Sequence, residues 1–120
     1  VTSWERKSLT VEETFANDLQ DILSIRAQIP ELFRSWEQRM EKGGYWNRIA
    51  GWVVKLKFFD FKSTTHEVSC RQRPTVQDFS LLIDNAFDRQ KKPVRLLGLG
   101  CRLKESLAPE QGQQRDLFEL

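Results

Sequence analysis

The sequence predicts an α+β fold in which a four-stranded, mostly antiparallel sheet carries two helices on one face. Two segments place apolar side chains at three- and four-residue steps, which is typical of amphipathic helices. Four other segments alternate apolar and polar side chains, as half-buried strands do. In chain order these segments give β-α-β-β-α-β, and two helices can cover only one face of such a sheet.

The strands are recognised by their alternation. Their expected bounds are residues 5–15, 48–60, 63–72 and 94–103. In the second strand Leu56 and Phe58 share one face, whereas Lys55 and Lys57 share the other. In the last strand leucine and cysteine alternate with two glycines and Arg102. We therefore expect basic side chains and glycines on the face that the helices leave open.

The helices are recognised by their start signals as well as by their period. Asn17 is expected to cap the first helix, because Gln20 follows at the capping-box spacing. Pro30 lacks the N–H that an interior helical position donates, so we expect a kink there or a change from one helix to another. A Gly-Gly pair ends this element. Thr75 and Asp78 have the N-cap and N3 spacing of the second helix.

The net charge of +2 conceals an uneven distribution. Residues 42–73 carry seven basic and two acidic side chains, and residues 89–104 carry six basic and no acidic ones. Residues 75–88 carry three aspartates and no basic side chain, and residues 17–41 carry three basic and five acidic ones. The open face of the sheet is therefore expected to be positive and the helical face negative.

A positive open face suits a nucleic-acid backbone. Lysine and arginine neutralise phosphates, and hydroxyls and backbone N–H groups bond phosphate oxygens. Gly98 and Gly100 remove side chains where a backbone could approach closely. Phe59 is the only obvious outward aromatic, so a duplex backbone is favoured over stacked single-stranded bases. Three alternatives remain: a lysine-bearing face that only discourages edge pairing, a sheet-based RNA-binding module, and a protein-interaction domain.

The sequence offers no catalytic or metal site. Phosphoryl transfer assisted by metal ions needs clustered carboxylates that hold those ions. Glu12 and Glu13 are adjacent on a strand and would point to opposite faces, and Asp84 and Asp88 fall on the solvent side of a helix. No Ser-His-Asp set, P-loop or dinucleotide fingerprint is present. We therefore expect a binding domain that catalyses nothing and contains no cofactor.

The cysteine content and the absence of a long apolar run argue against disulfide-rich, zinc-binding and membrane-spanning proteins. Cys70 and Cys101 are too few for a disulfide scaffold or a zinc site, and His66 adds no plausible ligand set. We expect two buried thiols in a cytoplasmic, monomeric protein. No apolar run approaches the roughly 20 residues that span a bilayer. The start at Val1 suggests a piece of a longer protein.

Three segments follow one another along the chain: RKSLTVEETF at residues 6–15, VKLKFFDFKSTT at residues 54–65 and PVRLLGLG at residues 93–100. In this order they resemble the C-terminal little finger domain of Y-family DNA polymerases. The resemblance implies that the open face lies across the major groove of a primer-template duplex and grips both backbones. It also implies an error-prone translesion polymerase as the parent protein, a nucleotidyltransferase whose magnesium-binding carboxylates lie in another domain.

The same resemblance assigns the DNA contacts. By position they are Arg6, Lys7, Ser8, Lys55, Lys57, Thr64, Thr65, His66 and Arg95. His66 replaces an arginine that is common in the family, and a neutral imidazole would hold phosphate less firmly; a packed or solvated histidine is the alternative. Arg95 has the parity of the inward Leu97, so it would have to swing outward where the strand begins.

The C-terminal segment resembles a second family motif. Residues 1–104 are expected to form the DNA-binding domain, and residues 105–120 a flexible tail. Within the tail, residues 114–118 (QRDLF) resemble the peptide with which bacterial polymerases bind the sliding clamp. Leu117 and Phe118 would fill a pocket on the clamp and Gln114 would hydrogen-bond beside it. Arg115 departs from the usual leucine, and a frayed terminus is the alternative.

Overall fold

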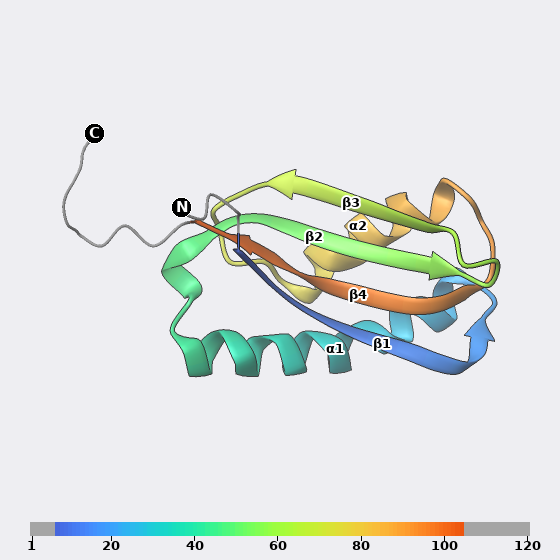
Figure 1. Cartoon of the computed structure of the whole chain (residues 1–120), viewed down its shortest axis with the longest axis horizontal. Helices are drawn as coiled ribbons and strands as arrows, with labels where there is room; N and C mark the ends of the chain where they lie inside the picture. The colour runs from blue at the N-terminus through green and yellow to red at the C-terminus, as the bar shows by residue number, and fades with distance from the viewer. Residues whose placement is uncertain (1–6, 105–120) are drawn as a thin grey trace, which may run out of the picture.

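The computed structural model describes residues 7–104 as one sheet backed by two helices (Figure 1). The strands are β1 (Lys7–Leu19), β2 (Ile49–Phe58), β3 (Ser63–Ser69) and β4 (Val94–Leu103). The helices are α1 (Ile22–Gly43) and α2 (Val76–Asp88), and a short 3₁₀ turn, Trp46–Arg48, precedes β2. The element order confirms the predicted β-α-β-β-α-β fold.

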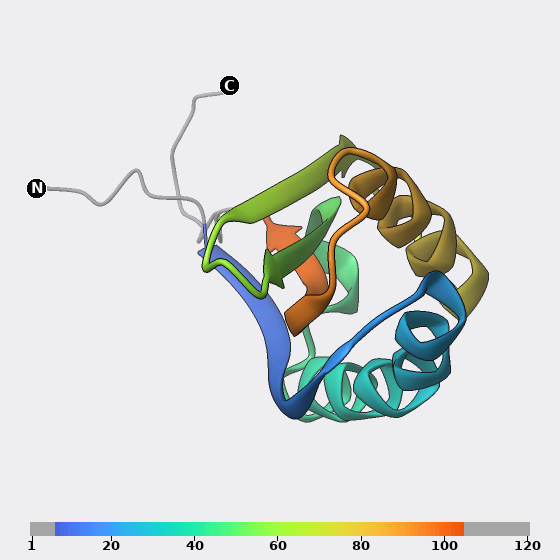
Figure 2. The ribbon, with the colours of Figure 1, turned by 90° about the vertical axis from the view of Figure 1, so that its right-hand side faces the viewer.

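The sheet has the strand order β1-β4-β2-β3, and every neighbouring pair is antiparallel. The last strand of the chain therefore lies between the first and the second. Along one rung Val11, Leu99 and Val54 are neighbours, and all three are buried. Both helices lie on that side of the sheet, so the opposite side is uncovered (Figure 2).

Helix α1 begins later than the sequence predicted. Asn17 is still part of β1, which continues to Leu19 and there pairs with Val94 of β4. The cap is Asp21, whose carboxylate accepts a hydrogen bond of 2.8 Å from the backbone N–H of Ser24. Of the two alternatives expected at Pro30, the change from one helix to another does not occur, since one helix runs through this position. Pro30 is exposed, and so is Arg26, whose carbonyl Pro30 cannot bond.

Helix α2 begins where the sequence predicted. Thr75 accepts a hydrogen bond from the N–H of Asp78, and the Asp78 carboxylate accepts one from the N–H of Thr75, which completes the capping box. Its buried residues are Phe79, Leu82, Ile83 and Ala86. Arg26 of α1 donates two hydrogen bonds to the carboxylate of Asp84, which fixes the two helices to each other.

The core lies between the sheet and the helices and is centred on Trp36. This indole packs edge-on against Phe79, with ring centroids 5.5 Å apart, and its Nε1–H donates to the carbonyl of Leu9 at 3.0 Å. Cys101 is fully buried, and burial raises the pKa of its thiol to about 11, so the thiol is protonated at neutral pH. Cys70 is only half-buried, unlike the expectation.

Candidate nucleic-acid interface

The open face of the sheet is defined by the side chains that point away from the helices. On β2 the buried Val54, Leu56 and Phe58 alternate with the partly exposed Lys55 and Lys57. Strand pairing extends the same parity across the sheet. By this parity the open face also includes Ser8, Thr10, Glu12, Thr14, Val53, Ser63, Thr65, Glu67, Leu96, Gly98, Gly100 and Arg102. The predicted placement of Lys55 and Lys57 on the uncovered side is therefore confirmed.

The two glycines of β4 lie beside β1, where a side chain would meet atoms of the same chain. A Cβ on Gly100 would lie 2.5 Å from Cα of Thr10, and a Cβ on Gly98 would lie 3.0 Å from Cγ of Glu12. At Gly100 the backbone that approaches closely is that of β1, within the same chain, whereas at Gly98 the nearest atom belongs to the side chain of Glu12. Above the glycines the open face is hollowed into a depression of about 240 Å³, with Lys55 and Arg102 among its lining residues.

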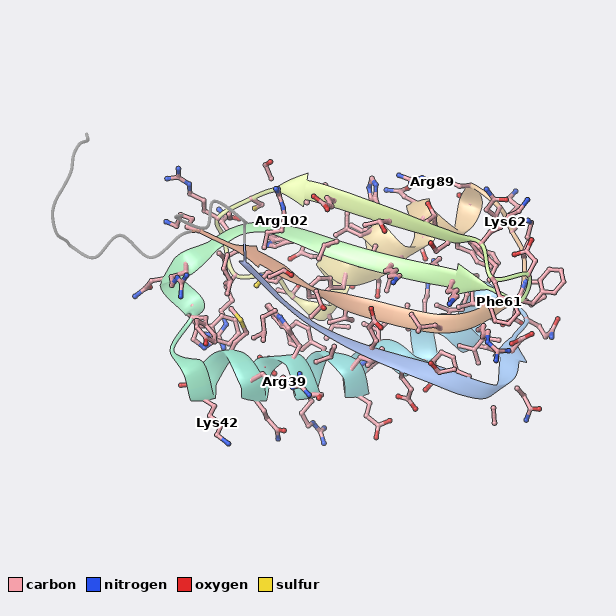
Figure 3. The ribbon with its side chains drawn as sticks, viewed as in Figure 1. Arg39, Lys42, Phe61, Lys62, Arg89 and Arg102 are labelled. Carbon is pink, nitrogen blue, oxygen red and sulfur yellow. The ribbon has the colours of Figure 1, made fainter. Side chains whose placement is uncertain are left out.

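The separation of charge between the two faces is less complete than the sequence predicted. Glu12 and Glu67 share the open face with the basic residues. Lys55 Nζ lies 3.8 Å from a carboxylate oxygen of Glu12. Arg102 Nε lies 3.2 Å from Glu67 at an angle that makes no hydrogen bond, so this contact is purely coulombic. Helix α1 itself carries four basic and three acidic side chains, and its Arg39 and Lys42 are on the helical side (Figure 3).

Lys57 and Arg95 meet at one aromatic ring. The register of β4 against β2 shifts between the pairs Lys57–Leu96 and Phe58–Val94, which leaves Arg95 without a partner on β2. This bulge explains how Arg95 escapes the parity of Leu97. Its guanidinium carbon lies 4.8 Å from the centroid of the Phe61 ring, and Lys57 Nζ lies 5.4 Å from the same centroid.

Three of the predicted contact residues do not lie together. Thr65 is on the open face opposite Lys55. Thr64 and His66 pair with Leu56 and Val54, so they have the parity of the helical side. There Arg89, which caps α2, donates to Thr64 Oγ1 at 2.8 Å and lies 2.7 Å from His66 Nδ1. This arrangement occupies His66 with an intramolecular partner, in keeping with the packed alternative.

The end of the sheet at the β2–β3 turn is basic. Figure 3 shows Phe61 and Lys62 at this turn and Arg89 nearby, where it bonds residues of β3. The adjoining loop between α2 and β4 adds Lys92, whose ammonium donates to the carboxylate of Asp60 at 2.8 Å. That hydrogen bond lowers the pKa of Asp60 below its usual value. The pair thus fastens the turn to the loop.

The remaining predicted site residues lie outside the described part of the chain. Arg6, the side chain of Lys7, and the clamp-binding residues Gln114, Leu117 and Phe118 are among them. Within residues 7–104 no group of three or more His, Cys, Asp or Glu side chains could hold a metal ion. None of the helices in this part of the chain is long and apolar enough to cross a membrane.

Comparison with known proteins identifies the family. Residues 6–117 match the impB/mucB/samB family C-terminal domain. The chain belongs to this family. It is the little finger domain of Y-family DNA polymerases, as the resemblance of the three segments suggested.

Relatives of this little finger domain agree with that assignment. It is 39% identical over 101 residues to the DNA polymerase IV of Marinomonas sp. (strain MWYL1), a match that covers 84% of this chain and 29% of that protein. It superposes with a TM-score of 0.77, at 32% identity, on a structure described as "Complex of beta-clamp processivity factor and little finger domain of PolIV"; 88% of this chain and 96% of that one are covered. A "Post-insertion binary complex of Dbh DNA polymerase" shares the fold, with a TM-score of 0.65 at 9% identity, 82% of this chain and 29% of that one being covered.

Sequence reasoning missed two side chains of the little finger domain. Phe61 was read as part of a connecting turn, although it is 62% exposed and contacts two cations. Its only signal was its place directly after a strand that carries Lys55 and Lys57. Arg89 was counted in a basic block, but its reach from α2 to β3 depends on tertiary packing.

Proposed function

We propose that this little finger domain binds the backbone of duplex primer-template DNA through the open face of its sheet, without regard to sequence. The observation that carries the proposal is the pair Lys55 and Lys57 on the uncovered side of β2, flanked by the hydroxyls of Thr65 and Ser63. Ammonium groups neutralise phosphates and hydroxyls bond their oxygens, and neither contact depends on the base sequence. Such indifference is what a moving polymerase requires.

The parent protein is proposed to be a magnesium-dependent, error-prone DNA polymerase of the translesion type, acting in the cytoplasm. This proposal is supported by the relatives called DNA polymerase IV, of which the chain spans about 29%. In that setting the domain supplies grip on the duplex, while chemistry belongs to other domains. The predicted contacts Arg6, Lys7 and Ser8 would extend the grip along β1 beyond Lys55 and Lys57.

A second contact is proposed for the C-terminal tail. Gln114, Leu117 and Phe118 would bind the sliding clamp, with the two apolar side chains in a pocket. The solved structure that pairs a beta-clamp processivity factor with a little finger domain at 32% identity favours this partner. The clamp would then hold the polymerase near the primer end while the sheet holds the duplex.

Salt dependence of binding tests the proposed DNA grip. If roughly five phosphates are neutralised, the logarithm of affinity should fall with the logarithm of salt at a slope of about −4 to −5. Fluorescence anisotropy with a labelled duplex measures this slope. Replacing Lys55 and Lys57 by alanine should reduce its magnitude by about 2, because each phosphate contact contributes about 0.9.

The matched control is Lys42→Ala, which removes a charge from α1 on the helical side (Figure 3). It should leave the slope unchanged. A slope near zero for the unaltered chain would exclude the grip. Tighter binding of single-stranded RNA than of duplex DNA at matched salt would favour an RNA-binding module, and retention on an acidic protein alone would favour an interaction domain.

A further inference from the structure

The β2–β3 turn contains a backbone conformation that its sequence does not favour. The N–H of Phe61 donates to the carbonyl of Phe58 at 2.9 Å, and the N–H of Phe58 donates to that of Lys62 at 2.8 Å. These bonds close a three-residue loop in which the third position adopts the left-handed conformation, usually as glycine. Phe61 occupies this position with φ of 69°. A bulky aromatic residue there is strained.

Burial does not explain the presence of phenylalanine at this position. The side chain of Phe61 is 62% exposed, so it adds little to the core. Its visible contacts are the two cations, Lys57 on one neighbouring strand and Arg95 on the other. The aromatic face attracts cations, and at exposed sites this attraction is sufficient to bias the direction of a flexible side chain.

The two cations at the ring lack a partner of opposite charge. Among residues 7–104, neither Lys57 nor Arg95 is part of an ion pair, whereas Lys55 and Arg102 both face a glutamate. Two like charges beside one ring repel each other until an anion lies between or across them. The cluster of Phe61, Lys57 and Arg95 is therefore arranged for an anionic ligand.

We propose that Phe61 is a positioning residue for a phosphate contact at the end of the sheet. Its ring holds the ammonium of Lys57 and the guanidinium of Arg95 toward one sugar–phosphate strand of bound DNA, and this role accounts for a phenylalanine at a strained backbone position. The inference rests on the proposed binding of duplex DNA. It adds an uncharged residue, Phe61, that strengthens this binding by positioning two charged ones.

Phe61→Gly is the sharpest test, because it moves stability and affinity in opposite directions. Glycine removes the strain at φ of 69°, so the Tm should be unchanged or up to roughly 5 °C higher. The Kd for a labelled DNA duplex should nevertheless rise about 3- to 10-fold, since both cations lose their common support. A residue with a merely structural role would give the opposite pattern, with lower stability or unchanged binding.

Two conservative variants separate the effect of the aromatic face of Phe61 from the effect of its apolar volume. Phe61→Tyr keeps the aromatic face and should bind within about twofold of the original chain. Phe61→Leu keeps an apolar side chain and the backbone strain, but it should bind as weakly as Phe61→Gly. Phe59→Ala is the matched control, because Phe59 is also exposed on this turn but makes no cation contact within the described residues. It should leave the Kd unchanged.

A double-mutant cycle tests whether Phe61 acts through the cations. In a chain that already carries Lys57→Ala and Arg95→Ala, adding Phe61→Gly should change the Kd by less than about 1.5-fold. An undiminished loss in that background would overturn the positioning role, as would equal binding by Phe61→Leu and Phe61→Tyr. If the unaltered chain binds duplex with the expected salt slope while Phe61→Gly binds equally well, only this inference fails. If the unaltered chain does not bind duplex, both proposals fail.

Discussion

Gly100 shows at the scale of one residue how closely β1 packs on β4. A Cβ at this position would meet the carbonyl oxygen of Leu9 and Cα of Thr10, which are backbone atoms that cannot turn aside. At Gly98 the nearest atom is Cγ of Glu12, at 3.0 Å, in a flexible side chain. The two glycines look equivalent in the sequence, yet only the first is fixed by backbone contacts.

Replacing these glycines by alanine should therefore have unequal effects. Gly100→Ala should lower the free energy of unfolding by about 2 kcal/mol or more, because β1 must move away from β4. Gly98→Ala, the control, should cost less than about 1 kcal/mol, since the Glu12 side chain can shift. Urea unfolding followed by tryptophan fluorescence measures both. Equal midpoints for the two variants would contradict the assigned packing.

At the scale of secondary-structure elements, the sequence predicted what local chemistry decides. The start of α2 follows from Thr75 and Asp78, which satisfy each other within one turn, and it was placed correctly. The start of α1 was misplaced because the pairing of Leu19 with Val94 keeps residues near Asn17 in the sheet. That pairing joins distant parts of the chain, so no local pattern reveals it.

In the candidate site, too, the sequence alone placed the residues that local pattern decides but could not place those that depend on tertiary structure. Alternation along β2 placed Lys55 and Lys57 correctly, because period two is a local property of a strand. The face of His66 depends on the geometry of the hairpin turn, and the outward direction of Arg95 depends on a bulge against β2. The order of the four strands also has no signal in the sequence, since it is set by which strands meet across the core.

The cap of α1 gives a pH-dependent prediction at this scale. The hydrogen bond from the backbone of Ser24 holds the pKa of Asp21 below its usual 3.8. The carboxylate therefore stabilises the folded chain above that value, and this contribution is lost as the pH falls through the lower pKa of the folded state. Asp21→Ala should lower the Tm by a few degrees at pH 7.

The same comparison should be repeated in acid. The difference in Tm between the original chain and Asp21→Ala should narrow as the pH falls from about 4 through the lower pKa of the folded state, where the original cap becomes protonated. Asp21→Asn is the matched control, because asparagine caps helices without titrating. It should remain close to the original chain at pH 7. A Tm difference for Asp21→Ala that is independent of pH would show that the charge of Asp21 is not involved.

At the scale of the whole molecule, the two proposed partners use different parts of the chain. Deleting residues 114–120 should abolish binding to the sliding clamp, since Leu117 and Phe118 are proposed to supply its apolar contact. The same deletion should leave the Kd for duplex DNA within about twofold, because the open face is untouched. Surface plasmon resonance against immobilised clamp and anisotropy with duplex measure the two. Clamp binding that survives the deletion would show that another surface of the chain binds the clamp.

The pairing of the first and last strands has a mechanical consequence. Lys7 at the start of β1 lies opposite Leu103 at the end of β4. The chain therefore enters β1 and leaves β4 at the same end of the sheet. The inter-strand hydrogen bonds of an antiparallel pair run perpendicular to the strands. Tension between an upstream attachment and a downstream one would therefore pull along these bonds and break them in succession from that end. Core residues farther along β4 would bear load only after the outer rungs had parted.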